Sequence, residues 1–224
     1  RIDITLDPQP FAQIAKYIKD VLNVSAPDVY LRPNEPGDIA VLNVKRDGQV
    51  APTMVVYQNL LRGKKEHHVA FALGKSMMEL YPPHYAYVTI DRSPQSLKQV
   101  FMACMRICGM PVQGDTAALD SIAREIQGRM SAGMIDQLRS LMKKFIQAGG
   151  STDVKRWAAA VELTGYRVGF LLCGDLPTSA LMISQESSLL GSTMTPKDKI
   201  KELVLYSISE DYFDARRSIG VQVG

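Results

Sequence analysis

The sequence predicts an α+β domain that is predominantly helical and carries one small sheet near its N-terminus. Short β-branched and aromatic segments lie between turn-forming residues before residue 60, and a long series of helix-periodic segments follows them. No repeat of about 30 to 40 residues recurs, which excludes a helical-repeat solenoid within this segment. The strands precede the helices instead of alternating with them, and this order indicates α+β.

The first expected element is a helix over residues 10–24, in which Phe11, Ile14, Ile18 and Leu22 recur at helical spacing after Pro10. Three apolar segments then predict strands at 28–33, 38–48 and 51–61, separated by the turn sequences PNEPGD and RDGQ. We expect them to form a small mixed sheet over about 29–58, with strand centres at 29–31, 39–44 and 54–57.

Helical periodicity dominates the chain after residue 62. Ser93-Pro94 and Thr195-Pro196 each place an N-cap residue before a proline, and Gly174 is a C-terminal stop signal. The expected helices cover residues 66–81, 93–108, 116–130, 132–147, 153–173, 177–184, 196–208 and 210–218. The first of these follows the strands directly, so we expect it to lie across the sheet.

Composition predicts one ordinary globular domain over residues 1–224, because 46% of the residues are hydrophobic and 22% are charged. The 26 basic and 23 acidic residues nearly balance, and no basic block is interleaved with aromatic residues, so we expect no nucleic-acid partner. The segment RGKK is expected to be a solvated loop. No apolar run predicts a membrane span and no signal peptide opens the chain. Because the first residue is Arg1, we expect the domain to be excised from a longer protein.

The pattern of sulfur-containing residues favours a packing role for them over a chemical one. Cys104, Cys108 and Cys173 are an odd count without a CxxC pair, which predicts buried free thiols in a reducing compartment, the cytoplasm. Packing is also expected for Trp157. The same holds for a group of methionines, which more often fill a core than form a binding face: Met102, Met105, Met110, Met130, Met134 and Met142.

The segment FALGKSMMELYPPHY, residues 71–85, is framed like the helix of a HExxH zinc peptidase but lacks its ligands. That helix places two zinc-binding histidines four residues apart, and the glutamate after the first histidine polarises the zinc-bound water. At this spacing the chain has Lys75 and Glu79, with Ser76 in the glutamate position. A protonated lysine cannot ligate zinc, and a serine is no general base for water.

The longer stretch HHVAFALGKSMMELYPPHYAY resembles the active-site helix of the HtpX-type zinc metallopeptidase family. Gly74 matches the glycine before the first ligand, and His84 matches a later histidine of the family. A second stretch, AAAVELTGYRVGFLLCGD, resembles the downstream helix of that family. Glu162 falls on the third zinc ligand, Arg167 continues the match, and Tyr166 replaces the family's aspartate. The resemblance covers about residues 29–183.

The resemblance implies a zincin-like fold whose small sheet lies on the former active-site helix. Three of the four reactive positions differ, so it implies a catalytically inactive domain without metal or cofactor, serving as a protein-interaction or scaffold module. The chain is also similar to degenerate peptidase-like domains at the C-termini of large bacterial proteins with tetratricopeptide repeats. The alternative is a hydrolase with an unusual metal site or a nucleophile near Ser76.

Several pairings are open at these positions. Lys75 could replace the zinc bridge by pairing with Glu162, or its ammonium could reach solvent. A metal site rebuilt from histidines is disfavoured, because a helix rises about 16 Å from His68 to Glu79. His84 is expected to hold the turn at the end of the helix in a Pro-Pro loop. A Ser/Lys nucleophile is disfavoured because neighbouring side chains on a helix diverge.

Overall fold

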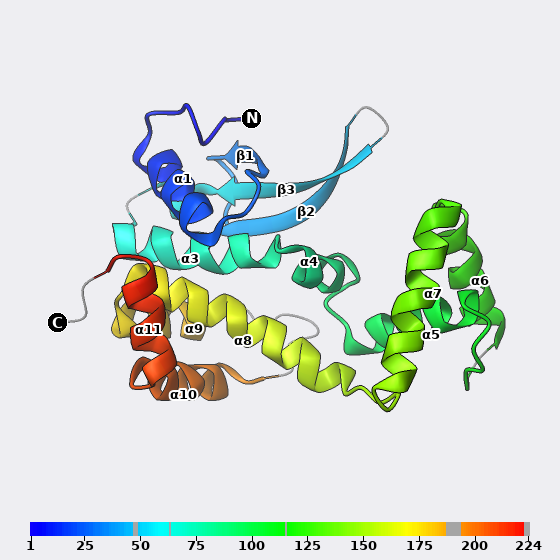
Figure 1. The fold of residues 1–224 in the computed structure, drawn as a ribbon. Helices are drawn as coiled ribbons and strands as arrows, with labels where there is room; N and C mark the ends of the chain where they lie inside the picture. Colours follow the sequence, from blue (N-terminus) through cyan, green and yellow to red (C-terminus); the bar gives the residue numbers. More distant parts are fainter. Residues whose placement is uncertain (47–48, 63, 115, 187–193, 222–224) are drawn as a thin grey trace.

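The chain forms eleven helices and three strands in the residues that the computed structural model describes, 1–46, 49–62, 64–114, 116–186 and 194–221 (Figure 1). The expected α+β class, mostly helical with a small sheet, is confirmed. In chain order the elements are α1 (Pro10–Leu22), β1 (Asp28–Arg32), β2 (Ile39–Arg46), β3 (Gln49–Tyr57), α2 (Gln58–Leu61), α3 (Glu66–Glu79), α4 (Pro82–Thr89), α5 (Pro94–Ile107), α6 (Thr116–Gln127), α7 (Ala132–Gln147), α8 (Val154–Cys173), α9 (Leu176–Gln185), α10 (Pro196–Ser207) and α11 (Glu210–Ser218).

The sheet is mixed, as expected, with the strand order β1-β3-β2. β1 runs parallel to the central strand β3, and β2 pairs with β3 in antiparallel fashion. Val29 and Val41 lie opposite Met54 on its two sides, and all three side chains are buried. The third expected strand ends earlier than predicted, because the apolar residues after Tyr57 form the short helix α2.

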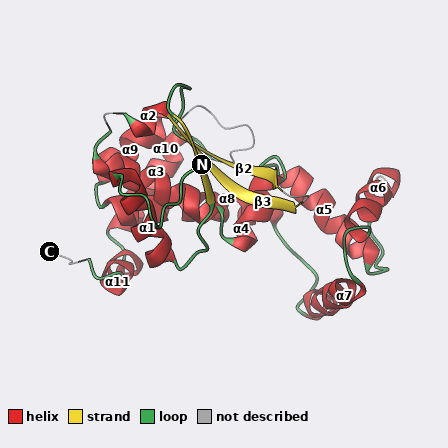
Figure 2. Ribbon diagram, turned by 90° about the horizontal axis from the view of Figure 1, so that it is seen from above, coloured by secondary structure: helices red, strands yellow, loops and turns green. Residues whose placement is uncertain are grey.

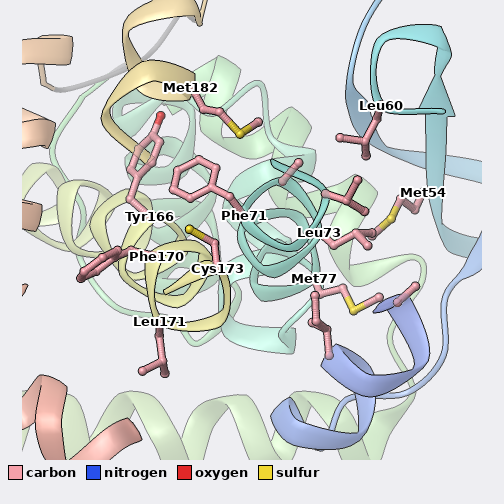
Figure 3. Close-up of a cluster of buried hydrophobic side chains, with 14 of the residues drawn as sticks. Met54, Leu60, Phe71, Leu73, Met77, Tyr166, Phe170, Leu171, Cys173 and Met182 are labelled. Carbon is pink, nitrogen blue, oxygen red and sulfur yellow. The ribbon is translucent and has the colours of Figure 1, made fainter. Parts of the chain in front are cut away.

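Helix α3 lies between the sheet and α8 (Figure 1). Leu73 and Met77 are fully buried on the side of α3 that faces Met54, whereas Phe71 points toward Tyr166 of α8 (Figure 3). A helix buried on two sides needs apolar residues around most of its circumference, which explains the continuous apolar run of this segment. The prediction that this helix lies across the small sheet is therefore confirmed.

The contact between α3 and α8 is close because glycines lie at the crossing. A Cβ atom placed on Gly169 would lie 2.8 Å from the Phe71 carbonyl oxygen. A Cβ atom on Gly74 would lie 2.8 Å from a methyl carbon of Leu172 and 3.2 Å from the Gly169 Cα. The two distances of 2.8 Å are too short for real Cβ atoms and the distance of 3.2 Å is tight, so these glycines let the two helix backbones come together. The two family-like stretches thus form the central helix pair of the domain.

The expected helix 66–81 is shorter than predicted, and a second helix follows it. α3 ends at Glu79, and Pro82 and Pro83 occupy the first turn of α4, where proline is well tolerated. His84 therefore lies on a helix, and the expected Pro-Pro loop is wrong. Its Nδ1 atom lies 3.1 Å from the Met78 carbonyl oxygen, so its role in holding the end of α3 agrees with the structure.

Helices α5 to α7 form a lobe that stands apart from the rest of the chain, and the N-terminal end of α8 reaches it (Figure 2). The start signals of the helices are confirmed here and in α10, since the hydroxyls of Ser93 and Thr195 accept hydrogen bonds from backbone N–H groups. Gly174 ends α8 in the left-handed conformation, with φ 66°. No helix within the described residues is long and apolar enough to cross a membrane.

The packing expected for the sulfur-containing residues holds only in part. All three cysteines are free, but Cys173 alone is buried, and Cys104 and Cys108 are half-buried. Met142 is buried, Met134 is exposed, and the other methionines of the group are half-buried, so the core interpretation of the methionines holds only in part. The lobe is small and open, and its helices have fewer neighbours to cover their apolar faces.

Candidate functional site

The structure brings five of the predicted site residues around one small cavity of about 30 Å³ between α3 and α8. Lys75 and Glu79 reach it from α3, and Glu162 and Tyr166 reach it from α8. His84 on α4 also lines the cavity. The prediction that the helix with Glu162 passes beside the helix with Lys75 is confirmed.

The remaining predicted positions lie outside this cavity. Gly74 is at the helix crossing described above. Ser76 is buried and lines a separate groove of about 320 Å³ beside β2. Arg167 points away from the cavity, toward Glu202 at 3.4 Å and the ring of Tyr206 at 5.1 Å.

Lys199 is the cation that neutralises Glu162. Its Nζ atom lies 2.6 Å from the Glu162 Oε1 atom, and the two side chains are 5% and 13% exposed. Lys75 instead forms a salt bridge with Glu186, which is the C-cap of α9. Of the two alternatives for Lys75, the pair with Glu162 is wrong, and its ammonium is held by Glu186 instead of reaching solvent. Lys199 is closer because α10 packs against α8 and delivers a buried ammonium group to the carboxylate.

Tyr166 connects the two salt bridges. Its hydroxyl accepts a hydrogen bond from Lys199 Nζ at 3.0 Å and donates one to Glu186. The ammonium groups of Lys75 and Lys199 lie 4.6 and 4.9 Å from the centroid of its ring, within the range of cation–π attraction. Burial, and then the negative charge of Glu186, raise the pKa of Tyr166 far above its ordinary value. The phenol therefore stays protonated and acts as a hydrogen-bond donor, not as a base.

Glu79 is held by Arg92, from the turn between α4 and α5. The guanidinium donates two hydrogen bonds to the carboxylate, at 2.9 and 2.8 Å, a bidentate geometry that is among the stronger charged contacts. The backbone of Arg92 is in the left-handed region, with φ 50°, and its carbonyl oxygen accepts a hydrogen bond from the Tyr87 hydroxyl at 2.6 Å. This turn presents the guanidinium to the cavity.

Sequence reasoning missed Lys199, Glu186 and Arg92, which supply half of the charges in this network. One signal was available for Lys199. It lies four residues before Leu203, so both side chains face the buried side of α10. A lysine at a core position of an amphipathic helix indicates a buried acidic partner. No comparable local pattern marks Glu186 or Arg92, since both lie in turns next to helix ends.

The residues of this cluster do not fit a zinc ion. Zinc ligands must offer free lone pairs, whereas Glu162 faces the ammonium of Lys199 and Glu79 is chelated by Arg92. Within the described residues, no group of three or more His, Cys, Asp or Glu side chains is arranged to hold a metal ion. His67 is engaged at the N-terminal end of α3, where its Nδ1 lies 2.7 Å from the Cys173 carbonyl oxygen.

Ser76 has no basic hydrogen-bond partner among the residues that the structure describes. The adjacent Lys75 is engaged by Glu186. A serine without a base that removes its proton is a weak nucleophile. The arrangement is thus suited to holding helices together through charge.

Comparisons with protein-family models, with curated proteins and with solved structures found no match to this chain.

Proposed function

We propose that this chain is a degenerate, catalytically inactive domain related to the HtpX-type zinc metallopeptidases, with a zincin-like fold, that serves as a protein-interaction or scaffold module. Two motif-like stretches in the expected order support the proposal, since they form the contacting helices α3 and α8 and turn their ligand-equivalent residues toward one cavity. A cytoplasmic location, a parent protein with tetratricopeptide repeats and a protein partner belong to the same proposal.

The observation that carries the proposal is the salt bridge between Lys199 and Glu162. Glu162 takes the position of the third zinc ligand, and its carboxylate is neutralised by an ammonium group at 2.6 Å. A buried carboxylate needs a positive partner, which a zinc ion supplies in a metallopeptidase and a lysine supplies here. Glu79, at the position of a zinc-binding histidine, is likewise paired with a cation, Arg92.

The charge network also gives a physical reason why the helices keep this arrangement without a metal ion. Lys75, Tyr166, Glu186 and Lys199 connect α3, α8, the end of α9 and α10 through direct polar contacts. A metal ion would hold such helices through coordination, and this network holds them through ion pairs and hydrogen bonds. A domain stabilised in this way keeps its surface available for binding without any reaction at its centre.

The alternative function is a hydrolase that uses a nucleophile near Ser76. One observation favours it, because Ser76 and Lys75 both line the groove of about 320 Å³ between α3, α9 and β2. The salt bridge of Lys75 with Glu186 weighs against it, since a protonated and paired lysine cannot accept the serine proton.

Zinc analysis of the purified protein tests the proposal. We expect less than stoichiometric zinc after dialysis and no change of the melting temperature when zinc is added. Stoichiometric zinc that survives dialysis, or a wild-type protein that zinc stabilises, would overturn the inactive interpretation. Reaction of the protein with a serine-directed fluorophosphonate probe, lost on Ser76→Ala, would favour the hydrolase instead.

A restored ligand set provides the positive control. Lys75→His, Ser76→Glu and Glu79→His recreate the HExxH spacing, but Glu162 is still occupied by Lys199. We expect zinc to raise the melting temperature only when Lys199→Met is added to these three changes. Equal zinc responses with and without Lys199→Met would show that the salt bridge is not what excludes the metal.

A further inference from the structure

A wide groove opens between α5, the C-terminal end of α7 and the segment that leads into α8, and its lining is both apolar and polar. Its volume is about 920 Å³, and it continues into a neighbouring pocket of about 260 Å³. The rings of Phe101 and Phe145 line both spaces and contact each other edge to face, with centroids 5.2 Å apart. We call this the lobe groove, and its apolar lining consists mainly of Leu97, Phe101, Met102, Met105, Phe145 and Trp157.

Helix α7 continues the groove with an apolar seam that is covered only in part. Met134, Leu138, Leu141 and Phe145 follow the alternating four- and three-residue spacing of a helix that pairs with another helix. Met134 and Leu141 are 50% and 61% exposed, and Met142 is the one described residue of α7 that is buried. Leu138 and Phe145 are half-buried, so the described residues cover this seam, the α7 seam, only in part. An α-helix normally buries its apolar stripe, so the exposed Met134 and Leu141 are suited to a further partner.

The charges around the lobe groove and the α7 seam are basic. Lys98 and Lys155 line the groove, Lys144 precedes Phe145 beside the seam, and Arg156 follows Lys155. None of these four side chains forms a salt bridge with another described residue. The one carboxylate among the groove-lining residues is Asp153, whose side chain accepts a hydrogen bond from the Arg156 backbone N–H at the start of α8.

We propose that the lobe groove and the α7 seam bind an amphipathic helix of a partner protein whose apolar stripe is flanked by acidic side chains. The inference rests on the proposed interaction role and assigns it a surface and a partner chemistry. Apolar side chains of the partner cover Leu141 and enter the groove at Phe145, and its carboxylates meet the four unpaired cations. The 16 residues of α7 span about 24 Å, which suits a partner helix of about four turns.

The same charges argue against a second copy of this chain as the occupant. A symmetric pairing through the α7 seam would bring the seam-flanking Lys144 of each copy toward the basic rim of the other. Like charges in a partly desolvated contact oppose association. An acidic helix removes this repulsion and gains attraction from the same residues, so charge complementarity selects it.

Peptide binding measured by fluorescence anisotropy tests the inference. The probe is a fluorescein-labelled peptide of about three heptads, with leucine at the first and fourth positions of each heptad and glutamate at the flanking fifth and seventh positions. A matched peptide carries lysine in place of every glutamate. We expect the glutamate peptide to bind at least about tenfold more tightly, and this preference to shrink at high salt.

Exposed substitutions locate the binding surface. Leu141→Glu is expected to weaken binding of the glutamate peptide by at least about tenfold, and Met134→Glu should act in the same direction. Leu205→Glu is the matched control, because Leu205 is 51% exposed on α10, and it should leave binding unchanged. Lys98→Glu with Lys155→Glu should shift the preference toward the lysine peptide, whereas Lys201→Glu on α10 should not.

Three results would overturn the inference. These are no binding of either peptide, equal binding of both peptides, or equal effects of Leu141→Glu and Leu205→Glu. A dimer in analytical ultracentrifugation that Leu141→Glu abolishes would assign the surface to a second copy and overturn the acidic partner. None of these measurements depends on zinc content. A negative result for peptide binding at the lobe groove is therefore distinguishable from a negative result for the peptidase-like proposal.

Discussion

Lys199→Met removes the cation that neutralises Glu162 and leaves the carboxylate without it. The two side chains are 5% and 13% exposed, so water cannot replace the lost partner fully. Breaking a buried ion pair from one side lowers the free energy of unfolding by about 3–5 kcal/mol. A protein of this size loses about 2–4 °C of melting temperature for each kcal/mol, so we expect a decrease of about 6–20 °C.

Denaturant titration and thermal melting of the wild type and four variants measure this effect. Glu162→Leu added to Lys199→Met should recover most of the lost stability, because the buried carboxylate that lost its cation is then removed. Lys201→Met on the exposed side of α10 is the matched control and should change stability little. Lys75→Met should lower the free energy of unfolding by less, about 1–3 kcal/mol, since the Lys75–Glu186 side chains are 17% and 23% exposed.

Two outcomes would refute this reasoning. A Lys199→Met protein as stable as wild type would mean that Glu162 does not depend on the ammonium group. A double variant no more stable than Lys199→Met alone would mean that the loss comes from packing of the lysine side chain and not from the stranded charge.

Further predictions concern the helix crossing, one histidine and the second charge pair. Gly169→Ala should lower the free energy of unfolding by about 1–3 kcal/mol in denaturant titration, because its Cβ atom meets the α3 backbone at 2.8 Å. Gly165→Ala is the control in the same assay and should be neutral or stabilising, because the nearest contact of its Cβ atom is at 3.5 Å. Burial, followed by nearby lysines, lowers the pKa of His68 below 6.5, so the unfolded chain binds the extra proton. This contribution to stability is present above pH 6.5 and is lost as the pH falls, and the melting temperature of His68→Gln should therefore fall less between pH 7 and pH 5. Arg92→Met should destabilise the domain by stranding Glu79, whose side chain is 14% exposed, and Glu79→Leu should restore stability; equal melting of Arg92→Met and wild type would contradict the pairing.

Local patterns in the sequence were sufficient for the type and order of most elements. The strands around Val29 and Met54, the helix starts at Ser93 and Thr195, and the stop at Gly174 follow from side-chain period and capping chemistry, which act within a few residues. Helix ends were less well predicted. The helix at residue 66 ends at Glu79, because two consecutive prolines restart the chain in a new turn.

The sequence by itself predicted that the two stretches carrying Lys75 and Glu162, which resemble a zinc-peptidase site without its ligands, pack against each other. Only the tertiary structure decided which cation pairs with which carboxylate. Lys199 reaches Glu162 because α10 packs on α8, and Lys75 pairs with Glu186 at the end of α9. Ion pairs depend on distances of a few ångströms between elements that are remote in the chain, and no local period encodes those distances.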